Sequence, residues 1–349
     1  MHPRNICPLP RPLTHIHLKL LLQKHALDQL GAAASNTVAG RRAFVVTDAN
    51  VAPLYLGRAA RALADAGFAT AHEILPPGEA AKCAGNLFAL WQRLHAHGVT
   101  RADAIVALGG GVIGDLAGFA AATWLRGCPL IHVPTTLLAQ VDSSIGGKTG
   151  IDLPFGKNLA GAFHQPALTL MDPALLATLP RGEFANGMAE VVKYACIADA
   201  SLLNANAPDD FIGRCVEIKR GIVARDERDT GERMVLNFGH TIGHAIEQLS
   251  NYAIPHGSAV AIGMVAAARI GEFYGITARG TSVALATRLR ELHLPVETDY
   301  GADEIFNALL SDKKNLAGKI HFILLEKIGK AVITPFAPDE LLALMKGVL

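Results

Sequence analysis

The chain has 349 residues, of which half are hydrophobic and 18% are charged, with a formal net charge of +1. This length exceeds what one hydrophobic core usually serves, so we expect two domains. The balanced charge argues against a nucleic-acid or membrane-surface role, and no uncharged apolar run reaches the ~18 residues of a membrane span. The five scattered cysteines show no C-x-x-C spacing, which favours reduced thiols and a cytoplasmic protein.

The first half of the chain alternates strand-like and helix-like segments. Local patterns predict strands, of which the one at 43–48 is expected to be buried and the one at 69–75 ends at Pro76-Pro77-Gly78, and helical periodicity predicts two helices between them. The strands are expected at 43–48, 69–75, 104–108 and 130–133, and the helices at 52–66 and 83–97. Because such alternation is typical of a parallel sheet covered by helices, we expect an α/β, Rossmann-like nucleotide-binding domain over residues 1–174.

A glycine-rich turn, Gly109-Gly110-Gly111-Val112-Ile113-Gly114-Asp115, follows the strand predicted at 104–108. Glycines let backbone N–H groups approach a pyrophosphate, and a following helix N-terminus adds positive potential. The turn does not follow the first strand, and no acid lies about 20 residues further on to hold a ribose. Asp48, which closes the earlier strand, is the better ribose candidate. The alternative is an ordinary tight turn between a strand and a helix.

A lysine-containing loop, Asp142 to Thr149, nearly fits the phosphate-binding P-loop, but Asp142 replaces its first glycine. Lys148 lies among glycines here, and Lys157 and Asn158 follow closely in a second glycine-containing loop. Two mobile cations and an amide suit a phosphate or a carboxylate. The alternative is a pair of solvated surface lysines.

Helical periodicity dominates the second half of the chain, in contrast to the alternating strands and helices of the first half. We expect a mainly α-helical domain over residues 175–349, with the active site in the cleft between the two domains. The expected helices cover 183–196, 211–226, 240–249, 257–274 and 281–292, and a late hairpin is expected from 320–325 and 330–333.

One carboxylate and two imidazoles of the helical half, Glu190, His240 and His256, form a common ligand set for a catalytic zinc. His240 and His244 share a helix face, but residue 241 is Thr, which excludes the H-E-x-x-H motif of zinc proteases. Each histidine alone is more often a structural residue than a ligand. One histidine is chemically more useful as a proton relay than as a further ligand.

Together these motifs resemble the 3-dehydroquinate synthase family, within the sugar phosphate cyclases. The likeness spans residues 42–333 and rests on Gly109–Gly118, Arg126-Gly127, Pro134–Leu138, Val141–Thr149, Gly156–Asn158, Glu190–Tyr194, Leu236–Ala245 and Asp312–Lys314. It implies a homodimer that uses NAD and one zinc or cobalt ion to convert 3-deoxy-D-arabino-heptulosonate 7-phosphate, a sugar acid phosphate, into 3-dehydroquinate and phosphate. The implied steps, in the shikimate route to aromatic amino acids, are transient oxidation, phosphate β-elimination, re-reduction and intramolecular aldol closure.

The resemblance also implies roles for individual residues. The metal ligands would be Glu190, His240 and His256, and His244 would move protons. The phosphate would be bound by Lys148, Asn158, Lys313 or Lys314 and Arg126 of the partner subunit. Other substrate oxygens, including the carboxylate, would be bound by Lys219, Arg233 and Asn237, and the ring hydroxyls by Asp142 and Lys193. NAD would be lined by Asp48, Glu79, Lys82, Gly110, Gly111, Val112, Asp115, Thr135, Thr136, Lys148, Lys157 and Thr178.

Three departures from the family pattern stand out. Ser258 replaces a usual Glu after His256-Gly257, Asp229 replaces a longer acid, and Gly78–Lys82 lacks a polar-aromatic pair. We expect Ser258 to loosen the support of a metal ligand. Three alternatives stay open: another sugar phosphate cyclase, a metal-dependent polyol dehydrogenase of the glycerol dehydrogenase type, and a non-catalytic descendant of the enzyme.

Overall fold

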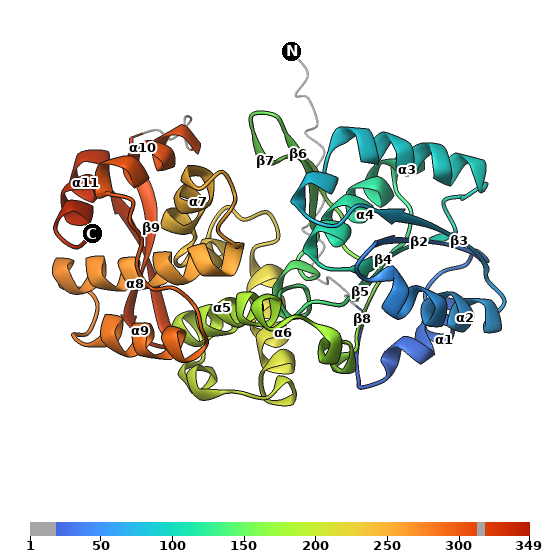
Figure 1. Cartoon of the computed structure of the whole chain (residues 1–349), viewed down its shortest axis with the longest axis horizontal. Helices are drawn as coiled ribbons and strands as arrows, with labels where there is room; N and C mark the ends of the chain where they lie inside the picture. Colours follow the sequence, from blue (N-terminus) through green and yellow to red (C-terminus); the bar gives the residue numbers. More distant parts are fainter. Residues whose placement is uncertain (1–18, 313–317) are drawn as a thin grey trace, which may run out of the picture.

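The structure is a computed structural model that describes residues 19–312 and 318–349, and it has a sheet-containing half and a helical half (Figure 1). The sheet half contains six parallel strands in the order β1-β8-β5-β4-β2-β3. They are β1 (Leu20–Leu22), β2 (Arg42–Asp48), β3 (Ala69–Leu75), β4 (Ala104–Gly109), β5 (Leu130–Pro134) and β8 (Leu168–Met171). This parallel sheet confirms the predicted α/β class.

Helices cover both faces of the sheet because successive strand side chains point to opposite sides. Val45 and Val106 pack with α1 (Leu30–Ser35) and α2 (Gly57–Asp65). Phe44 and Val46 pack on the other face with α3 (Ala84–Ala96) and α4 (Gly111–Thr123). Full burial of each such side chain stabilises the fold by roughly 1.5–3 kcal/mol.

The strand order reverses between β2 and β4. β2 pairs with β3 on one side and with β4 on the other, so the connections that leave β2 and β4 diverge. Ligands of open α/β sheets bind at such a switch point, outside the carboxyl ends of the strands. Asp48 ends β2 and Gly109 ends β4, which places both residues at this crevice.

Two parts of the sheet half differ from the sequence prediction. The helix predicted at 52–66 is a π-helical turn, Ala52–Leu56, that precedes α2; Pro53 at its start lacks a backbone donor. The segment predicted as lysine-containing loops is an antiparallel hairpin of β6 (Lys148–Leu153) and β7 (Gly156–Phe163). A Cβ on Gly161 would lie 2.1 Å from the Thr149 carbonyl oxygen, so a glycine permits this close pairing.

The helical half surrounds α8 (His256–Tyr274), whose residues from Ala259 to Ala268 are all buried. The five helices and the hairpin predicted here are confirmed. Around α8 lie α5 (Arg181–Ile197), α6 (Pro208–Arg225), α7 (His240–Leu249), α9 (Thr281–Glu291), α10 (Ala302–Asp312), β9 (Ile320–Lys327), β10 (Lys330–Phe336) and α11 (Pro338–Lys346). Within the described residues, every helix is too short or too polar to traverse a lipid bilayer. The boundary at residues 174 and 175 stays a prediction.

Candidate active site

Glu190 is a buried carboxylate on α5, with a side chain that is only 1% exposed. Lys193, one turn further along the same helix, forms an ion pair with it. Burial opposes ionisation, but Lys193 and His240 hold the pKa of Glu190 well below its ordinary value. Neither carboxylate oxygen has a well-formed hydrogen bond. A buried, ionised group in this state is suited to an external cation.

Two imidazoles converge on this carboxylate from the first residues of two helices. His240 begins α7 and His256 begins α8, and the Nε2 atom of each lies 3.4 Å from Glu190 Oε1. The three donor atoms lie within 4.8 Å of one another. The predicted ligand residues are therefore brought together across three helices, and such a set suits zinc while leaving a coordination position open.

Close helix packing at glycines makes this convergence possible. Gly239 has a φ of +79°, and a Cβ there would lie 2.4 Å from Met264 Cγ. A Cβ on Gly257 would lie 2.1 Å from the Asn186 carbonyl oxygen. The first close approach brings the start of α7 onto α8, and the second brings the start of α8 onto α5.

The outer nitrogens of both imidazoles also have partners. His240 Nδ1 lies 3.1 Å from the Phe238 carbonyl oxygen, and His256 Nδ1 lies 3.1 Å from Glu247 Oε2. Burial alone would raise the pKa of Glu247, but His256, His244 and Lys157 lower it to about 2. Sequence reasoning missed Glu247. Its spacing of three residues from His244 and seven from His240 places all three on one face of α7 and is the signal that could have found it.

His244 lies beside the two candidate ligands. Its ring centroid is 5.4 Å from that of His240 and 6.0 Å from that of His256. Desolvation by the surrounding protein and the neighbouring imidazoles lower the pKa of His244 below its ordinary value, while its ring still reaches solvent. A neutral, accessible imidazole can accept a proton.

A second ionic cluster surrounds Asp142. Lys193 Nζ lies 3.3 Å from Asp142 Oδ1, Lys219 Nζ lies 2.9 Å from Oδ2, and the Tyr194 hydroxyl donates to Oδ1. Burial opposes ionisation, but Lys193 and Lys219 hold the pKa of Asp142 well below its ordinary value. Lys193 contacts both Asp142 and Glu190, so this cluster and the metal donor set are continuous. Sequence reasoning assigned no role to Tyr194.

The remaining residues predicted to bind substrate are only partly gathered. Arg233 is buried, and its Nη1 and Nη2 donate to the carbonyls of Glu227 (2.6 Å) and Gly146 (3.2 Å). Lys148 is half-exposed and paired with Asp229. Asn237 is half-buried just before α7, and Arg126 is exposed with a φ of +67°. The predicted positions Lys313 and Lys314 lie outside the described residues.

Lys82 gathers two of the acidic residues predicted to bind NAD, together with Asn158. Its Nζ lies 2.8 Å from Glu79 Oε1, 3.2 Å from Asp115 Oδ2 and 2.7 Å from Asn158 Oδ1. The structure thus places Asn158 at the Lys82 cluster, whereas Lys148 pairs with Asp229. Lys157 Nζ lies 3.8 Å from Glu79 Oε1 and 3.4 Å from Glu247 Oε1, so it connects this cluster to the helical half.

The glycine turn opens directly into α4, which contains Gly111, Val112 and Asp115. A Cβ on Gly110 would lie only 3.0 Å from Thr136 Cγ2. Nearby Thr135 has a buried hydroxyl without a hydrogen-bond partner.

The two other residues predicted to bind NAD are held by local contacts. Asp48 Oδ1 accepts from the backbone N–H groups of Asn50 and Val51. Thr178 Oγ1 lies 2.6 Å from the Tyr55 hydroxyl.

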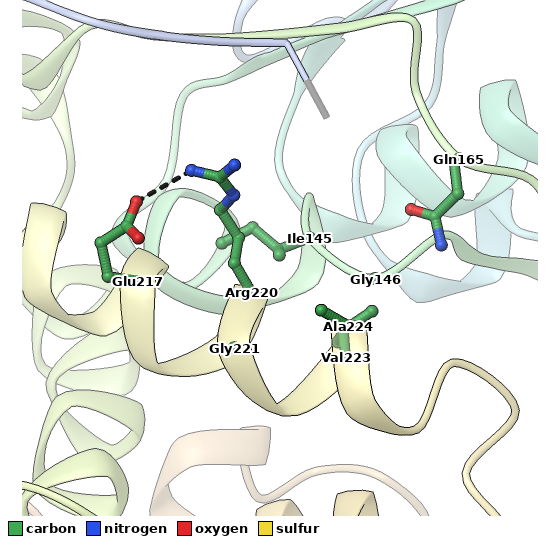
Figure 2. A pocket seen from close by; sticks show the side chains of 8 residues that line it. All are labelled: Ile145, Gly146, Gln165, Glu217, Arg220, Gly221, Val223 and Ala224. Carbon is green, nitrogen blue, oxygen red and sulfur yellow. Dashed lines mark hydrogen bonds and ion pairs between the residues drawn. The ribbon is translucent and has the colours of Figure 1, made fainter. Parts of the chain in front are cut away.

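A small pocket of about 230 Å³ lies next to Arg233, away from the metal donors. Figure 2 shows Arg220 and Glu217 paired on α6, with Gln165 on the opposite wall. Gly146 lines the pocket and accepts from Arg233, so it separates the pocket from that guanidinium. The lining residues are Ile145, Gly146, Gln165, Glu217, Arg220, Gly221, Val223 and Ala224, none of which the sequence analysis assigned to the site.

Comparison with known proteins places these features in a family. The family models of the 3-dehydroquinate synthase N-terminal and C-terminal regions match residues 72–186 and 187–315. The 3-dehydroquinate synthase of Symbiobacterium thermophilum is 49% identical over 319 residues, which cover 86% of this chain and 89% of that protein.

Solved structures of sugar phosphate cyclases are also similar. The 2-epi-5-epi-valiolone synthase of Streptomyces hygroscopicus, with NAD⁺ and Zn²⁺ bound, has a TM-score of 0.87 and 28% identity and covers 99% of each chain. A 2-deoxy-scyllo-inosose synthase complexed with carbaglucose-6-phosphate, NAD⁺ and Co²⁺ has a TM-score of 0.83 and 28% identity, and the match covers 95% of this chain and 96% of that one. Sequence matches over both halves and the shared fold show that the chain belongs to the 3-dehydroquinate synthase family.

Proposed function

We propose that this chain is a carbon–oxygen lyase that converts 3-deoxy-D-arabino-heptulosonate 7-phosphate into 3-dehydroquinate and inorganic phosphate, using NAD and one zinc or cobalt ion. The observation that carries the proposal is the continuous cluster of Glu190, His240, His256, Lys193 and Asp142. It joins a metal donor set to fixed charges that can orient a polyhydroxylated acid. The family membership directs this chemistry to the named substrate.

The residues present fit both cofactors. Glu190 has buried oxygens without hydrogen bonds, and His240 and His256 present nitrogen donors to the same point. The NAD would lie at the crevice between β2 and β4, where the turn at Gly110 leads into the N-terminus of α4 and the Thr135 hydroxyl has no hydrogen-bond partner. When bound, NAD supplies a reversible hydride acceptor and the metal a Lewis acid for adjacent hydroxyls.

The substrate would be oriented by charges that the protein already holds in place. Arg233 is fixed by two backbone carbonyls and Lys219 by Asp142, so both present preorganised positive charge to the carboxylate. Lys148 is more exposed and carries its own counterion, Asp229, which the substrate phosphate would displace. Asp142 and Lys193 would orient the ring hydroxyls.

Proton transfer is assigned to His244. Its neutral imidazole stands beside His240 and His256 without belonging to the first donor set. It would accept a hydroxyl proton during oxidation and return it later, which is the role of a general acid and base.

We also propose the organisation of the whole enzyme. Residues 1–174 would form the NAD-binding domain and residues 175–349 the metal- and substrate-binding domain, working as a cytoplasmic homodimer. The hairpin β6–β7 exposes Phe155, Leu159 and Phe163, which a second copy would cover. The exposed Arg126 of the partner subunit would then complete the phosphate site.

A phosphate-release assay tests the proposed reaction. The chain is incubated with the heptulosonate phosphate, catalytic NAD⁺ and zinc, and both phosphate and NADH are followed. We expect stoichiometric phosphate without net NADH, because the cofactor ends unchanged. Net NADH with glycerol would support a polyol dehydrogenase, and turnover only with a non-carboxylated sugar phosphate would support a different cyclase. Specific substrate binding without turnover would support a non-catalytic descendant.

A further inference from the structure

We infer that Glu247 is a positioning residue for His256, and that it selects Glu190, His240 and His256 as the metal site over the overlapping donor set His244, Glu247 and His256. The inference rests on the proposed metal site. It concerns a residue to which the sequence analysis gave no role.

The two donor sets share His256, so the orientation of one ring decides between them. Its two nitrogens face different carboxylates: Nε2 lies 3.4 Å from Glu190 Oε1, and Nδ1 lies 3.1 Å from Glu247 Oε2. An ionised carboxylate can only accept a hydrogen bond. Nδ1 of His256 is therefore the nitrogen that donates to Glu247, and Nε2 is the nitrogen left to face Glu190.

The second oxygen of Glu247 is also occupied. Its Oε1 lies 3.4 Å from Lys157 Nζ, and that ammonium lies 4.2 Å from the centre of the Tyr252 ring. The Glu247 side chain is only 7% exposed, so water has little access to either oxygen. Glu247 has a partner on each oxygen. Glu190 pairs with Lys193 through Oε2, whereas its Oε1 forms no hydrogen bond and faces the Nε2 atoms of both imidazoles. Glu190 Oε1 is therefore the oxygen better placed to bind a cation.

These contacts give Glu247 the role of the outer carboxylate in a carboxylate–histidine–metal arrangement. Such a carboxylate fixes the tautomer and ring direction of the ligand and raises its basicity. Ser258, which follows the ligand segment His256-Gly257, therefore does not hold His256 in place in this chain. Glu247 delivers it from α7, the helix that also contains His240 and His244.

The test measures Co²⁺ binding to the full-length apoprotein, by chelator competition and by the visible absorption spectrum. For Glu247→Ala we expect affinity to fall by about 10–100-fold, with Co²⁺ still bound and its bands shifted because His256 reorients. Glu247→Gln, which keeps the shape and one acceptor oxygen, should lie between this variant and the wild type. Glu272→Gln is the matched control, because Glu272 also accepts two hydrogen bonds, from Ser282, but lies at the far end of α8.

Ligand variants separate the two donor sets. We expect Glu190→Gln and His240→Ala to lose Co²⁺ and His244→Ala to retain it. The inference is overturned if Glu247→Ala binds Co²⁺ with wild-type affinity and spectrum, or if it loses the ion together with His244→Ala while Glu190→Gln keeps it. Thermal unfolding of each apoprotein excludes general misfolding, and Glu247→Gln serves if Glu247→Ala does not fold. A wild-type chain that binds no cation contradicts the proposed function itself, which is a different result.

Discussion

Each half of the molecule contains a cluster around a buried charged side chain, and the two side chains are surrounded in opposite ways. In the sheet half, the Lys82 ammonium is surrounded by oxygen atoms of Glu79, Asp115, Asp152 and Asn158. In the helical half, the Glu190 carboxylate is surrounded by nitrogen atoms of Lys193, His240 and His256. Their side chains are 4% and 1% exposed, so water compensates neither charge.

Both groups have oppositely charged neighbours, and the difference lies in whether each also has hydrogen-bond partners within the protein. Burial lowers the pKa of Lys82, but Asp115 and Glu79 more than offset this effect and raise it. Its ammonium has acceptors in place, whereas the Glu190 oxygens have no hydrogen bonds. The Lys82 cluster is therefore complete as a structural unit, whereas in the proposed function an external cation completes the Glu190 cluster.

Replacing Glu190 by Gln should have the largest effect on function. The amide keeps the shape but removes the negative charge, so we expect metal binding to be lost. Turnover should fall by about 10³-fold or more, because Lewis-acid stabilisation is worth several kcal/mol. Metal content after gel filtration and the phosphate-release assay measure both. A variant with full metal content and near-normal turnover would show that this carboxylate does not balance the cation.

His244→Ala should separate proton transfer from metal binding. We expect metal to be retained and turnover to fall by about 10²–10⁴-fold, the usual contribution of a positioned acid or base. The measurements are metal content and single-turnover kinetics at several pH values. Loss of zinc from this variant would mean that ligand and relay are assigned the wrong way round.

Lys82→Met should damage stability in the sheet half. Without the ammonium, Glu79, Asp115 and Asp152 face one another at a partly exposed site, and we expect a loss of about 1–3 kcal/mol in the free energy of unfolding. Urea titration measures this loss. The matched control is Lys148→Met, whose half-exposed pair with Asp229 is worth only about 0–1 kcal/mol. Equal losses of unfolding free energy in the two variants would show that the Lys82 cluster stabilises the fold no more than the exposed Lys148–Asp229 pair.

Lys157→Met should produce the smallest effect. It tests whether NAD⁺ binding in the sheet half changes metal affinity in the helical half. Lys157 lies between Glu79 and Glu247 and so connects the two clusters. We expect NAD⁺ to tighten Co²⁺ binding several-fold in the wild type, a coupling of about 1 kcal/mol. The variant should lose this dependence. Co²⁺ titrations with and without NAD⁺ measure it, and an unchanged ratio in the variant would show that the connection lies elsewhere.

The elements that the sequence analysis identified share a strong local pattern. The strands β2, β4 and β5 contain continuous apolar runs, β3 ends at Pro76-Pro77-Gly78, and the helices from α5 to α9 carry a clear helical period. The strands β1 and β8 have three and four residues, too few for a periodic signal. The hairpin β6–β7 contains several glycines and polar residues, and its pairing depends on the close approach of Gly161 to the Thr149 carbonyl, which no local pattern predicts.

The candidate site likewise contains residues that local motifs identify and residues that only contacts between elements identify. Glu190, His240, His244 and His256 carry recognisable motifs, whereas Glu247 and Tyr194 act through contacts with residues of other elements, and Asn158 meets Lys82 rather than Lys148. The sequence by itself determined which helices and strands form and which residues offer chemistry, because both depend on side-chain type and short-range spacing. Only the tertiary structure decided which nitrogen of His256 faces which carboxylate and which charges are left without partners. Those properties depend on the approach of α5, α7 and α8 at Gly239 and Gly257, and such distances between separate helices are not encoded in local periodicity.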